Sequence, residues 1–553
     1  MARRRRPPPF GGLVLGLIFL YASLTPSLVP RGWFIQGLVT GVSATIGYSL
    51  GVLSSHLLRL VLPREPAAAM KRWAWRTLAA LGLITAIISV LLAGRWQQQL
   101  HLVMGAKDPT QPAYLAVLVV AGVMVTLFVA IGRGLRLAAR AVGVRLRRWV
   151  PPRTAALTGA TLVALVGFGL VQGAMVRPLL SVADRSFQAL NETITDDVEP
   201  PDGPLLSGGP GSLITWESLG TQGRKFIDRA TSAEELAAFH DEQGAADSDP
   251  PAPIRVYAGL DTAEDVRERA EIAVAELERT GAFDRSVLCV AAATGTGWVN
   301  PTAVAALEHL HGGDTATVSM QYSYLPSWLS FLVDRDRASE AGEVLLDAVH
   351  ERWSSLPSDD RPLLVAYGES LGSFATESAF DAPPELWERT DGALLVGPPE
   401  FNPLRRALVR ERHPDSLQRL PVVDEGRTVR FAARPGDLDR LGTPWPRPRV
   451  VYLQHASDPI VWWSPGLAIR EPDWLAEPRG DDVLDEMRWF PLVTFWQLSA
   501  DLAYADEVPP GYGHDYGTAV LDGWIAVTDP NGWDDQELER LRAHLASRSA
   551  LDS

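Results

Sequence analysis

Residues 363–372 read LLVAYGESLG, and this stretch decides the fold. Its apolar run ends in Gly368-Glu369-Ser370-Leu371-Gly372, and a helix-like stretch, SFATESAF, follows at 373–380. A sharp turn from strand to helix needs glycine on both sides of the serine, because a side chain there would clash with the neighbouring strand. The turn exposes the hydroxyl above the positive end of the helix. This setting predicts that Ser370 is a nucleophile.

Charge divides the chain of 553 residues into two unlike parts. Residues 1–175 contain nineteen lysine or arginine residues and two acidic ones, a net charge of +17. The remainder contains 32 basic and 64 acidic side chains, a net charge of −32. Because the basic part is also the apolar part, we expect a membrane region followed by an acidic domain. The negative charge of that domain argues against binding to nucleic acid.

The basic part contains five apolar stretches long enough to cross a hydrocarbon core of about 30 Å as helices. They lie at residues 10–29, 34–58, 78–94, 113–132 and 154–175. We interpret them as five transmembrane helices. A cleaved signal peptide is the alternative for the first, but no small-x-small cleavage site follows it. Pairs of glycines four residues apart predict close packing of the second helix: Gly37 with Gly41, and Gly47 with Gly51.

Positive charge is concentrated in alternate loops of this region. Arginines or lysines cluster before the first stretch, between the second and third, and between the fourth and fifth, whereas the other loops hold few. Basic loops resist translocation, so they are expected to face the cytoplasm together with the N-terminus. An odd number of spans then places the chain after Met175 outside. We therefore expect a multi-pass protein of the cell membrane, embedded in the lipid bilayer, with an extracytoplasmic second domain.

Beyond the membrane region, strand-like and helix-like runs alternate, as a parallel sheet with crossover helices requires. Strands are expected at 254–258, 286–293, 316–322, 363–367, 392–397, 449–454 and 492–496, and helices at 262–280, 301–310, 337–353 and 534–545. The expected domains are a transmembrane region (1–176), an extracytoplasmic linker with an ordered island (177–253) and an α/β catalytic domain (254–553). The irregular, arginine-rich stretch 401–448 suits a cap inserted over the site.

A serine nucleophile needs a histidine base, and the base needs a carboxylate to orient it. With this kind of turn, the acid and then the histidine follow the serine along the chain. Asp458 lies just after an expected strand, and His514 lies in the flexible loop GYGHDYG at 511–517. The alternatives are a turn-forming Asp-Pro and a histidine that caps the next helix. His455 breaks the expected order, and His544 is interpreted as a solvated surface residue.

Backbone amides must stabilise the oxyanion of the reaction. One donor is expected to be the amide of Leu371, directly after the serine. The second is expected from the loop TGTGW at 294–298, where Gly295, Thr296 and Gly297 are the candidates. A dinucleotide-binding loop is the competing interpretation, but the third glycine of that pattern is replaced by Asn300.

The remaining chemistry-bearing residues are interpreted as structural. His309 and His311 are two apart on an expected helix, a spacing that does not favour chelation, so no metal and no cofactor is expected. The single cysteine, Cys289, lies in an apolar strand and is expected to be buried. In Trp216-Glu217-Ser218-Leu219-Gly220 the first glycine of the serine motif is missing, so Ser218 is interpreted as a decoy.

The serine turn, followed in order by the acid and the histidine, resembles the alpha/beta-hydrolase superfamily over about residues 254–530. With the membrane region, the whole chain resembles an actinobacterial family of membrane-anchored alpha/beta hydrolases with an N-terminal multi-span region. This resemblance implies an alpha/beta-hydrolase fold with a mostly parallel sheet, and ester hydrolysis or acyl transfer. Where many lipases have His-Gly-Gly-Gly, this chain has Thr294-Gly295-Thr296-Gly297, which leaves the acyl preference open.

Two functional hypotheses follow. The first is an extracytoplasmic serine esterase, lipase or acyltransferase whose substrate is an ester-linked envelope lipid or an acylated glycan. Anchoring by several helices favours a lipidic or acyl-ester substrate, because it concentrates the enzyme at the bilayer surface. The second is a non-catalytic envelope regulator or scaffold that retains the hydrolase fold. A peptidase is less favoured, because nothing marks a peptide-binding cleft, and the sequence identifies no protein partner.

Overall fold

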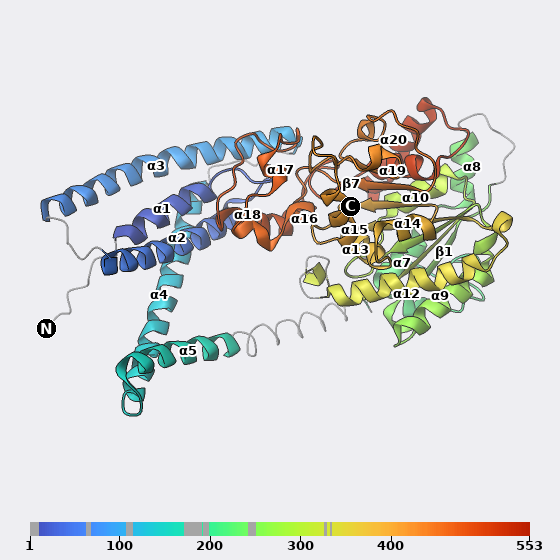
Figure 1. Cartoon of the computed structure of the whole chain (residues 1–553). Coiled ribbons are helices and arrows are strands. Elements are labelled where there is room, and N and C mark those ends of the chain that lie inside the picture. The colour runs from blue at the N-terminus through green and yellow to red at the C-terminus, as the bar shows by residue number, and fades with distance from the viewer. Residues whose placement is uncertain are drawn as a thin grey trace. The chain divides into compact units, whose positions relative to one another are not determined.

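The computed structural model describes residues 10–61, 68–106, 114–170, 191, 198–241, 250–325, 329–331 and 334–552 (Figure 1). Contacts divide the chain into two compact units. The first combines Met1–Val182 with Pro465–Tyr504, and the second combines Ala183–Ser464 with Ala505–Ser553. The insertion Pro465–Tyr504, which lies inside the expected domain 254–553, groups with the membrane region by its contacts.

The second unit is built on one sheet of seven parallel strands. In chain order they are β1 (Ile254–Ala258), β2 (Val287–Ala292), β3 (Thr315–Met320), β4 (Leu363–Glu369), β5 (Gly392–Val396), β6 (Val429–Ala432) and β7 (Arg449–Leu453). Their order across the sheet is β1-β3-β2-β4-β5-β7-β6. Nearly every strand residue is buried, as expected for a parallel sheet covered on both faces. The predicted α/β class with a mostly parallel sheet is confirmed.

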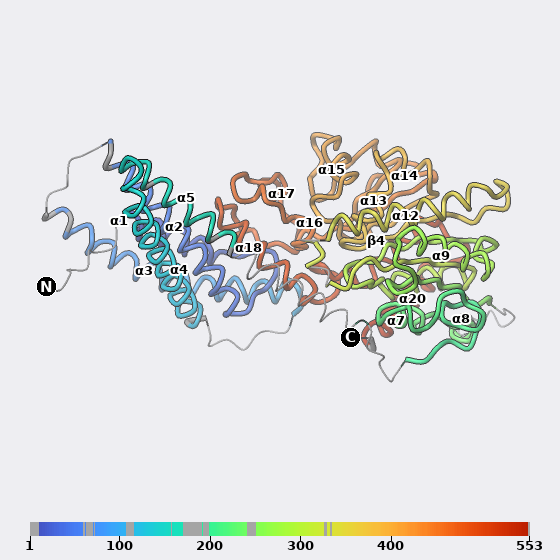
Figure 2. The backbone as a smooth tube through the Cα atoms, turned by 90° about the horizontal axis from the view of Figure 1, so that it is seen from below, coloured from blue at the N-terminus to red at the C-terminus, as the bar shows by residue number. Residues whose placement is uncertain are grey.

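Helices cover both faces of this sheet. On one face lie α9 (Val266–Thr280), α12 (Arg335–Ser354) and α13 (Leu371–Ser378), and on the other α10 (Pro301–Leu310), α19 (Ala519–Thr528) and α20 (Asp535–Asp552). Figure 2 shows α9 and α12 side by side. The shorter helices are α7 (Gly220–Asp228), α8 (Ala233–Asp241), α14 (Pro383–Arg389), α15 (Pro403–Arg410) and α16 (Pro459–Trp462).

The order of the strands reverses direction between β2 and β4, which lie side by side. From β2 the chain moves to β3 on one side, and from β4 it moves to β5 on the other. The loops that follow β2 and β4 therefore diverge at the carboxyl edge of the sheet. Such a switch point is where ligands bind in open α/β sheets.

Two stretches differ from the sequence prediction. The stretch 401–448 contains β6, which pairs with β7 at the edge of the sheet, so this part of it is no cap. The stretch 492–496 is no strand, because Leu492 is the N-cap of α18 (Val493–Asp501) and the other four residues belong to that helix. The buried residues of α18 recur with a helical period, but three of the five, Thr494, Gln497 and Asp501, are polar, so the sequence shows no apolar helical pattern there.

The membrane region comprises α1 (Phe10–Ser23), α2 (Trp33–Val61), α3 (Ala68–Val103), α4 (Tyr114–Leu146) and α5 (Pro152–Leu170). Within the described residues, only α2, α3 and α4 contain segments long and apolar enough to cross a membrane: Trp33–Leu58, Arg72–Val103 and Ala116–Leu146. The prediction of five spans is thus corrected to three candidates. With 14 residues, α1 is about 21 Å long, short of the core thickness. The expected fifth span continues beyond α5 to residues outside the described part.

Glycines bring α2 close to two neighbours, as predicted. A Cβ atom added to Gly41 would lie 2.6 Å from Cβ of Met124 in α4, and one added to Gly51 would lie 2.1 Å from the carbonyl oxygen of Gly11 in α1. Contacts this short exclude any larger side chain. The small residues therefore set the distance between these helices.

A buried ion pair joins the insertion to the loop between α1 and α2. Arg31 Nε lies 2.9 Å from Asp501 Oδ1, and both side chains are fully buried. The hydroxyl of Ser27 and the amide of Leu28 donate hydrogen bonds to Oδ2 of the same carboxylate. Gln497 Nε2, one turn earlier in α18, donates to the carbonyl oxygen of Thr25 at 3.0 Å. The insertion is therefore tied to loop 24–32 by a fully buried ion pair and by further polar contacts that are buried or partly buried.

Removing one partner of this pair would leave a buried charge without compensation, at a cost of about 3–5 kcal/mol. We expect Arg31→Ala to lower the free energy of unfolding of the full chain in detergent micelles by about this amount, as measured by urea denaturation. Arg470→Ala, which changes an exposed arginine of the same insertion, should change it by less than about 0.5 kcal/mol. Equal effects of the two substitutions would contradict this account of the pair.

Candidate active site

Ser370 occupies the strained turn that its neighbours predict. It lies between β4 and α13 with φ 54° and ψ −125°, a conformation rarely adopted by residues other than glycine. A Cβ atom added to Gly372 would lie 2.4 Å from the carbonyl oxygen of Ala292, so a side chain there would collide with the end of β2. The amide of Ser370 donates to the carbonyl oxygen of Val396 at the end of β5. The backbone of three neighbouring strands thus fixes this serine.

Asp458 and His514 meet, although 56 residues separate them in the chain. His514 Nδ1 lies 2.7 Å from Asp458 Oδ2, and both side chains are buried. Asp458 follows β7 as the first residue before α16, where its other oxygen accepts the amide of Ile460 at 2.8 Å. The Tyr516 hydroxyl donates to Asp458 Oδ2 at 2.8 Å. The carboxylate is thereby held from several sides.

The His514 ring lies over the carboxyl end of β5, beside the strand that carries Ser370. A Cβ atom added to Gly397 would lie 2.4 Å from Cε1 of His514, so the ring touches the backbone there. Gly397 directly follows Val396, whose carbonyl oxygen accepts the amide of Ser370. His514 Nε2 is buried and has no hydrogen-bond partner in the described part of the chain. The arrangement leaves this nitrogen available to a hydroxyl.

The loop after β2 is held by three buried side chains. Tyr322 Oη accepts the amide of Gly295 at 2.8 Å, Tyr257 Oη donates to the carbonyl oxygen of Gly297 at 2.7 Å, and Gln321 Nε2 donates to that of Thr296 at 2.7 Å. The amide of Gly297 donates to the carbonyl oxygen of Thr294. Of the three candidate amides, two are therefore occupied. Of the three, only the amide of Thr296 has no acceptor among the described residues.

Comparison with family models identifies the family of this fold. A model described as alpha/beta-hydrolase family matches residues 254–541, more than half of the chain. The chain belongs to this alpha/beta-hydrolase family. A second model, described as the N-terminus of the alpha/beta-hydrolase family, matches residues 24–230, which include α2 to α5. A comparison with curated proteins found no match.

In this hydrolase, acidic groups surround the buried His514 ring. Burial alone disfavours the imidazolium, but the charge and hydrogen bond of Asp458 outweigh it. With smaller contributions from Asp506 and Glu369, they raise the pKa of His514 to about 9. Burial also raises the pKa of Glu369, which accepts hydrogen bonds from Asn300 Nδ2 at 2.7 Å and from the Tyr367 hydroxyl at 2.8 Å. A protonated ring is therefore the favoured state at neutral pH.

Several residues near the site were not identified from the sequence. Tyr516 and Glu369 lie within the predicted motifs, two residues after His514 and one before Ser370. Their closeness to those residues in the sequence was the signal that could have identified them. The sequence contained no signal for Gly397, because its importance comes from its contact with the His514 ring, which belongs to a distant loop. The His455 ring stacks on Tyr516 at a centroid distance of 4.1 Å, and its Nδ1 lies 2.9 Å from the carbonyl oxygen of Gly513.

Four other candidates lie outside this site. The Ser218 hydroxyl donates to the carbonyl oxygen of Thr215 within a short 3-10 helix, which agrees with the decoy interpretation. His309 and His311 contact different partners, and His311 Nε2 lies 3.0 Å from Thr528 Oγ1. The prediction for His544 is wrong, because its ring is about two-thirds buried and contacts Glu235. The packing of α20 against α10 accounts for this burial.

The contact between Gly397 and the His514 ring predicts a steric test. In Gly397→Ala the new methyl group must displace the ring by about 1 Å to reach an ordinary contact distance, and a shift of this size can cost about a hundredfold in rate. We expect the labelling rate by a fluorophosphonate probe to fall by this factor. In the control Gly436→Ala no atom lies near the new methyl group, so labelling should not change. Equal rates for the two variants would contradict the proposed position of the ring.

Proposed function

We propose that the protein is a membrane-anchored serine hydrolase or acyltransferase that acts on an ester-linked envelope lipid or an acylated glycan. Ser370 attacks the acyl carbonyl, His514 takes its proton at Nε2, and Asp458 orients the ring through Nδ1. The observation that carries the proposal is the buried His514 ring, bonded to Asp458 at one nitrogen and without a partner at the other. A base in this state is arranged to accept a proton.

The oxyanion is stabilised by the amides of Leu371 and Thr296. The amide of Leu371 belongs to the first turn of α13, where amides have no partner within the helix. Thr296 is preferred to Gly295 and Gly297, because the amides of those two donate to Tyr322 and Thr294. The two donors lie on the loops at the switch point of the sheet. Each is worth on the order of a hundredfold in rate.

After the attack, His514 gives the proton to the leaving alcohol, and an acyl group remains on Ser370. Water or a sugar hydroxyl then attacks this acyl enzyme, with His514 again as the base, and the serine is released. The first acceptor gives hydrolysis, and the second gives acyl transfer. Because the substrate is drawn from the bilayer, anchoring supplies a high local concentration in place of tight binding.

We further propose that the hydrolase unit is extracytoplasmic. Loop 24–32 contacts the insertion that contains α18, so the two lie on the same side of the membrane. An even number of crossings must then separate them, and α2, α3 and α4 supply three. We infer that α5, whose 19 described residues measure about 28 Å, supplies the fourth. Basic residues at the start of α3, such as Arg72, and between α4 and α5, Arg147 and Arg148, then share the opposite, cytoplasmic side.

A fluorophosphonate probe tests the reaction on the full chain. We expect the wild type to be labelled and Ser370→Ala to lose labelling completely, because the probe reacts only with an activated serine. Asp458→Asn should lower the rate about a thousandfold or more, because the ring loses its orientation and charge stabilisation. Ser218→Ala is the matched control and should label like the wild type. An unlabelled but folded wild type would favour the alternative function, a non-catalytic scaffold.

The raised pKa of His514 predicts a pH dependence. Only the neutral ring accepts a proton, so the labelling rate should increase about tenfold from pH 7 to pH 8 and level off only above about pH 9. Asp506→Asn removes one of the charges that raise this pKa, so its profile should shift to lower pH. Asp535→Asn, an exposed carboxylate of α20, serves as the control and should leave the profile unchanged. A profile already level at pH 7 would contradict the assigned protonation state.

A further inference from the structure

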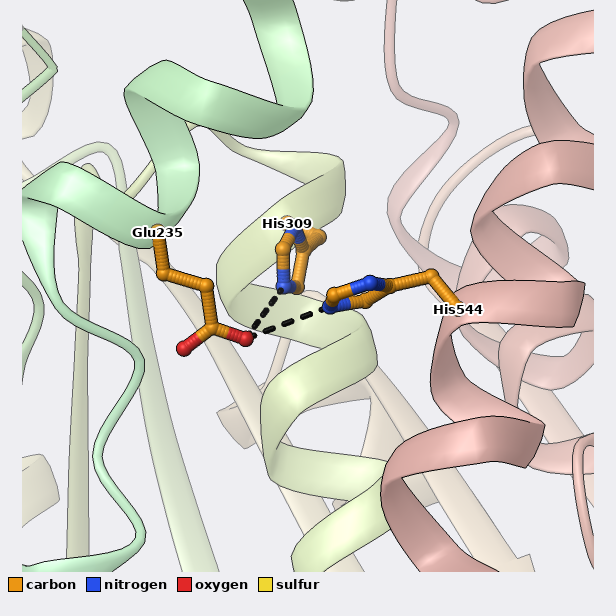
Figure 3. A group of neighbouring side chains, drawn as sticks. All are labelled: Glu235, His309 and His544. Carbon is orange, nitrogen blue, oxygen red and sulfur yellow. Dashed lines mark hydrogen bonds and ion pairs between the residues drawn. The ribbon is translucent and has the colours of Figure 1, made fainter.

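Three side chains from distant parts of the chain lie together in the hydrolase unit, away from the carboxyl edge of the sheet that carries Ser370. Glu235 comes from α8, His309 from α10 and His544 from α20 (Figure 3). The carboxylate of Glu235 faces the Nε2 atoms of both rings: Oε1 lies 3.8 Å from that of His309 and 3.2 Å from that of His544. One ligand atom from each of the three side chains lies within 4.8 Å of the others.

These distances suit a tetrahedral metal ion. Zinc bound at about 2.0–2.1 Å by nitrogen and oxygen ligands has neighbouring ligand atoms about 3.4 Å apart. The two distances from Glu235, 3.2 Å and 3.8 Å, lie on either side of that value. The ligand nitrogens of the two rings lie at most 4.8 Å apart, so they need to approach each other by no more than about 1.4 Å to complete the triangle. Side-chain rotation of the partly exposed His544 can supply this movement.

His309 provides an independent observation. Its side chain is fully buried, and neither ring nitrogen has a hydrogen-bond partner among the described residues. An unpaired polar atom in a protein interior is costly, so each such atom calls for an explanation. Its Nε2 points toward Glu235 and His544, where a metal ion would bind it.

The surroundings would orient the ligands. Arg548 Nη1 donates to Glu235 Oε1 at 2.7 Å, while Nη2 donates to the carbonyl oxygen of Arg229 at 2.6 Å. The Phe239 ring packs against His309 and His544 at centroid distances of 5.2 Å and 5.5 Å. Ligating carboxylates are commonly hydrogen-bonded in this way by groups outside the metal shell. Without a metal, the same contacts form a charge network between Glu235 and Arg548, which is the rival account.

The site lies away from the serine. Ser370 is at the carboxyl edge of the sheet, whereas α10 runs back from that edge and His309 is its next-to-last residue. A metal here therefore does not touch the acyl group. It would instead link α8 and the C-terminal helix α20 to α10, which packs on the sheet.

We propose that Glu235, His309 and His544 bind one zinc ion, with water as the fourth ligand, and that this ion fastens α20 and α8 to the hydrolase unit. Glu235 and His544 are each about one-third exposed, so water can reach the open position. Three protein ligands with one open position form a stable zinc site, and binding it stabilises the fold that presents those ligands.

The test uses the full chain in detergent micelles, purified with a tag that contains no histidine. After treatment with a chelator, the protein is titrated with Zn²⁺, and bound zinc is measured by elemental analysis after excess metal is removed. We expect one zinc per chain and a higher unfolding temperature with zinc than without it. Co²⁺ in place of zinc should give the intense visible absorption of a tetrahedral site.

Glu235→Gln and His544→Gln should each weaken zinc binding at least about tenfold and abolish the rise in unfolding temperature. His311→Gln, on the same turn as His309 but directed at Thr528, is the matched control and should bind zinc like the wild type. Circular dichroism establishes that each variant is folded. Wild-type protein that retains no zinc, or variants that bind it as well as the wild type, would overturn the proposal in favour of the charge network.

Discussion

The site depends on a steric constraint: three backbones approach so closely at the carboxyl edge of the sheet that no side chain fits between them. At Gly372 a methyl group would collide with the end of β2, and at Gly397 it would collide with the His514 ring. Ser370 can therefore be held at positive φ between its neighbours, where the strain is balanced by the packing of β4 and α13. The serine, the ring and the loop after β2 owe their positions to this close approach.

Electrostatic interactions act on the His514 ring. Asp458 contacts the His514 ring directly, and Asp506 and Glu369 add negative charge around it. In an enclosed site such charges are poorly screened, so they stabilise the imidazolium that forms when the serine gives up its proton. The same charges make the resting base harder to deprotonate. The acidic groups thus stabilise the His514 imidazolium formed during the reaction, but they also leave less of His514 in the neutral form at neutral pH.

The sequence predicted those features that local signals carry. The serine turn, the order of acid and histidine, and most strands follow from short motifs and from runs of buried apolar residues. Features that depend on contacts between distant segments could not be predicted from the sequence. The apolar run of the short β6 is interrupted by Arg430, whose buried side chain donates to carbonyl oxygens such as that of Gly426. In α18, polar residues are buried against loop 24–32. Likewise His544 looks like a surface residue until α20 is packed against α10.

The pair formed by Arg31 and Asp501 has a consequence for how this protein can be divided. A fragment that starts after the membrane helices keeps the insertion, but it loses Arg31, which pairs with the buried carboxylate of Asp501, and it loses α1 and α2, which pack against α18. Water would then reach surfaces that are dry in the intact chain, and the fragment would tend to self-associate. Proteolytic shedding of a soluble, well-folded hydrolase from the cell surface is therefore physically disfavoured.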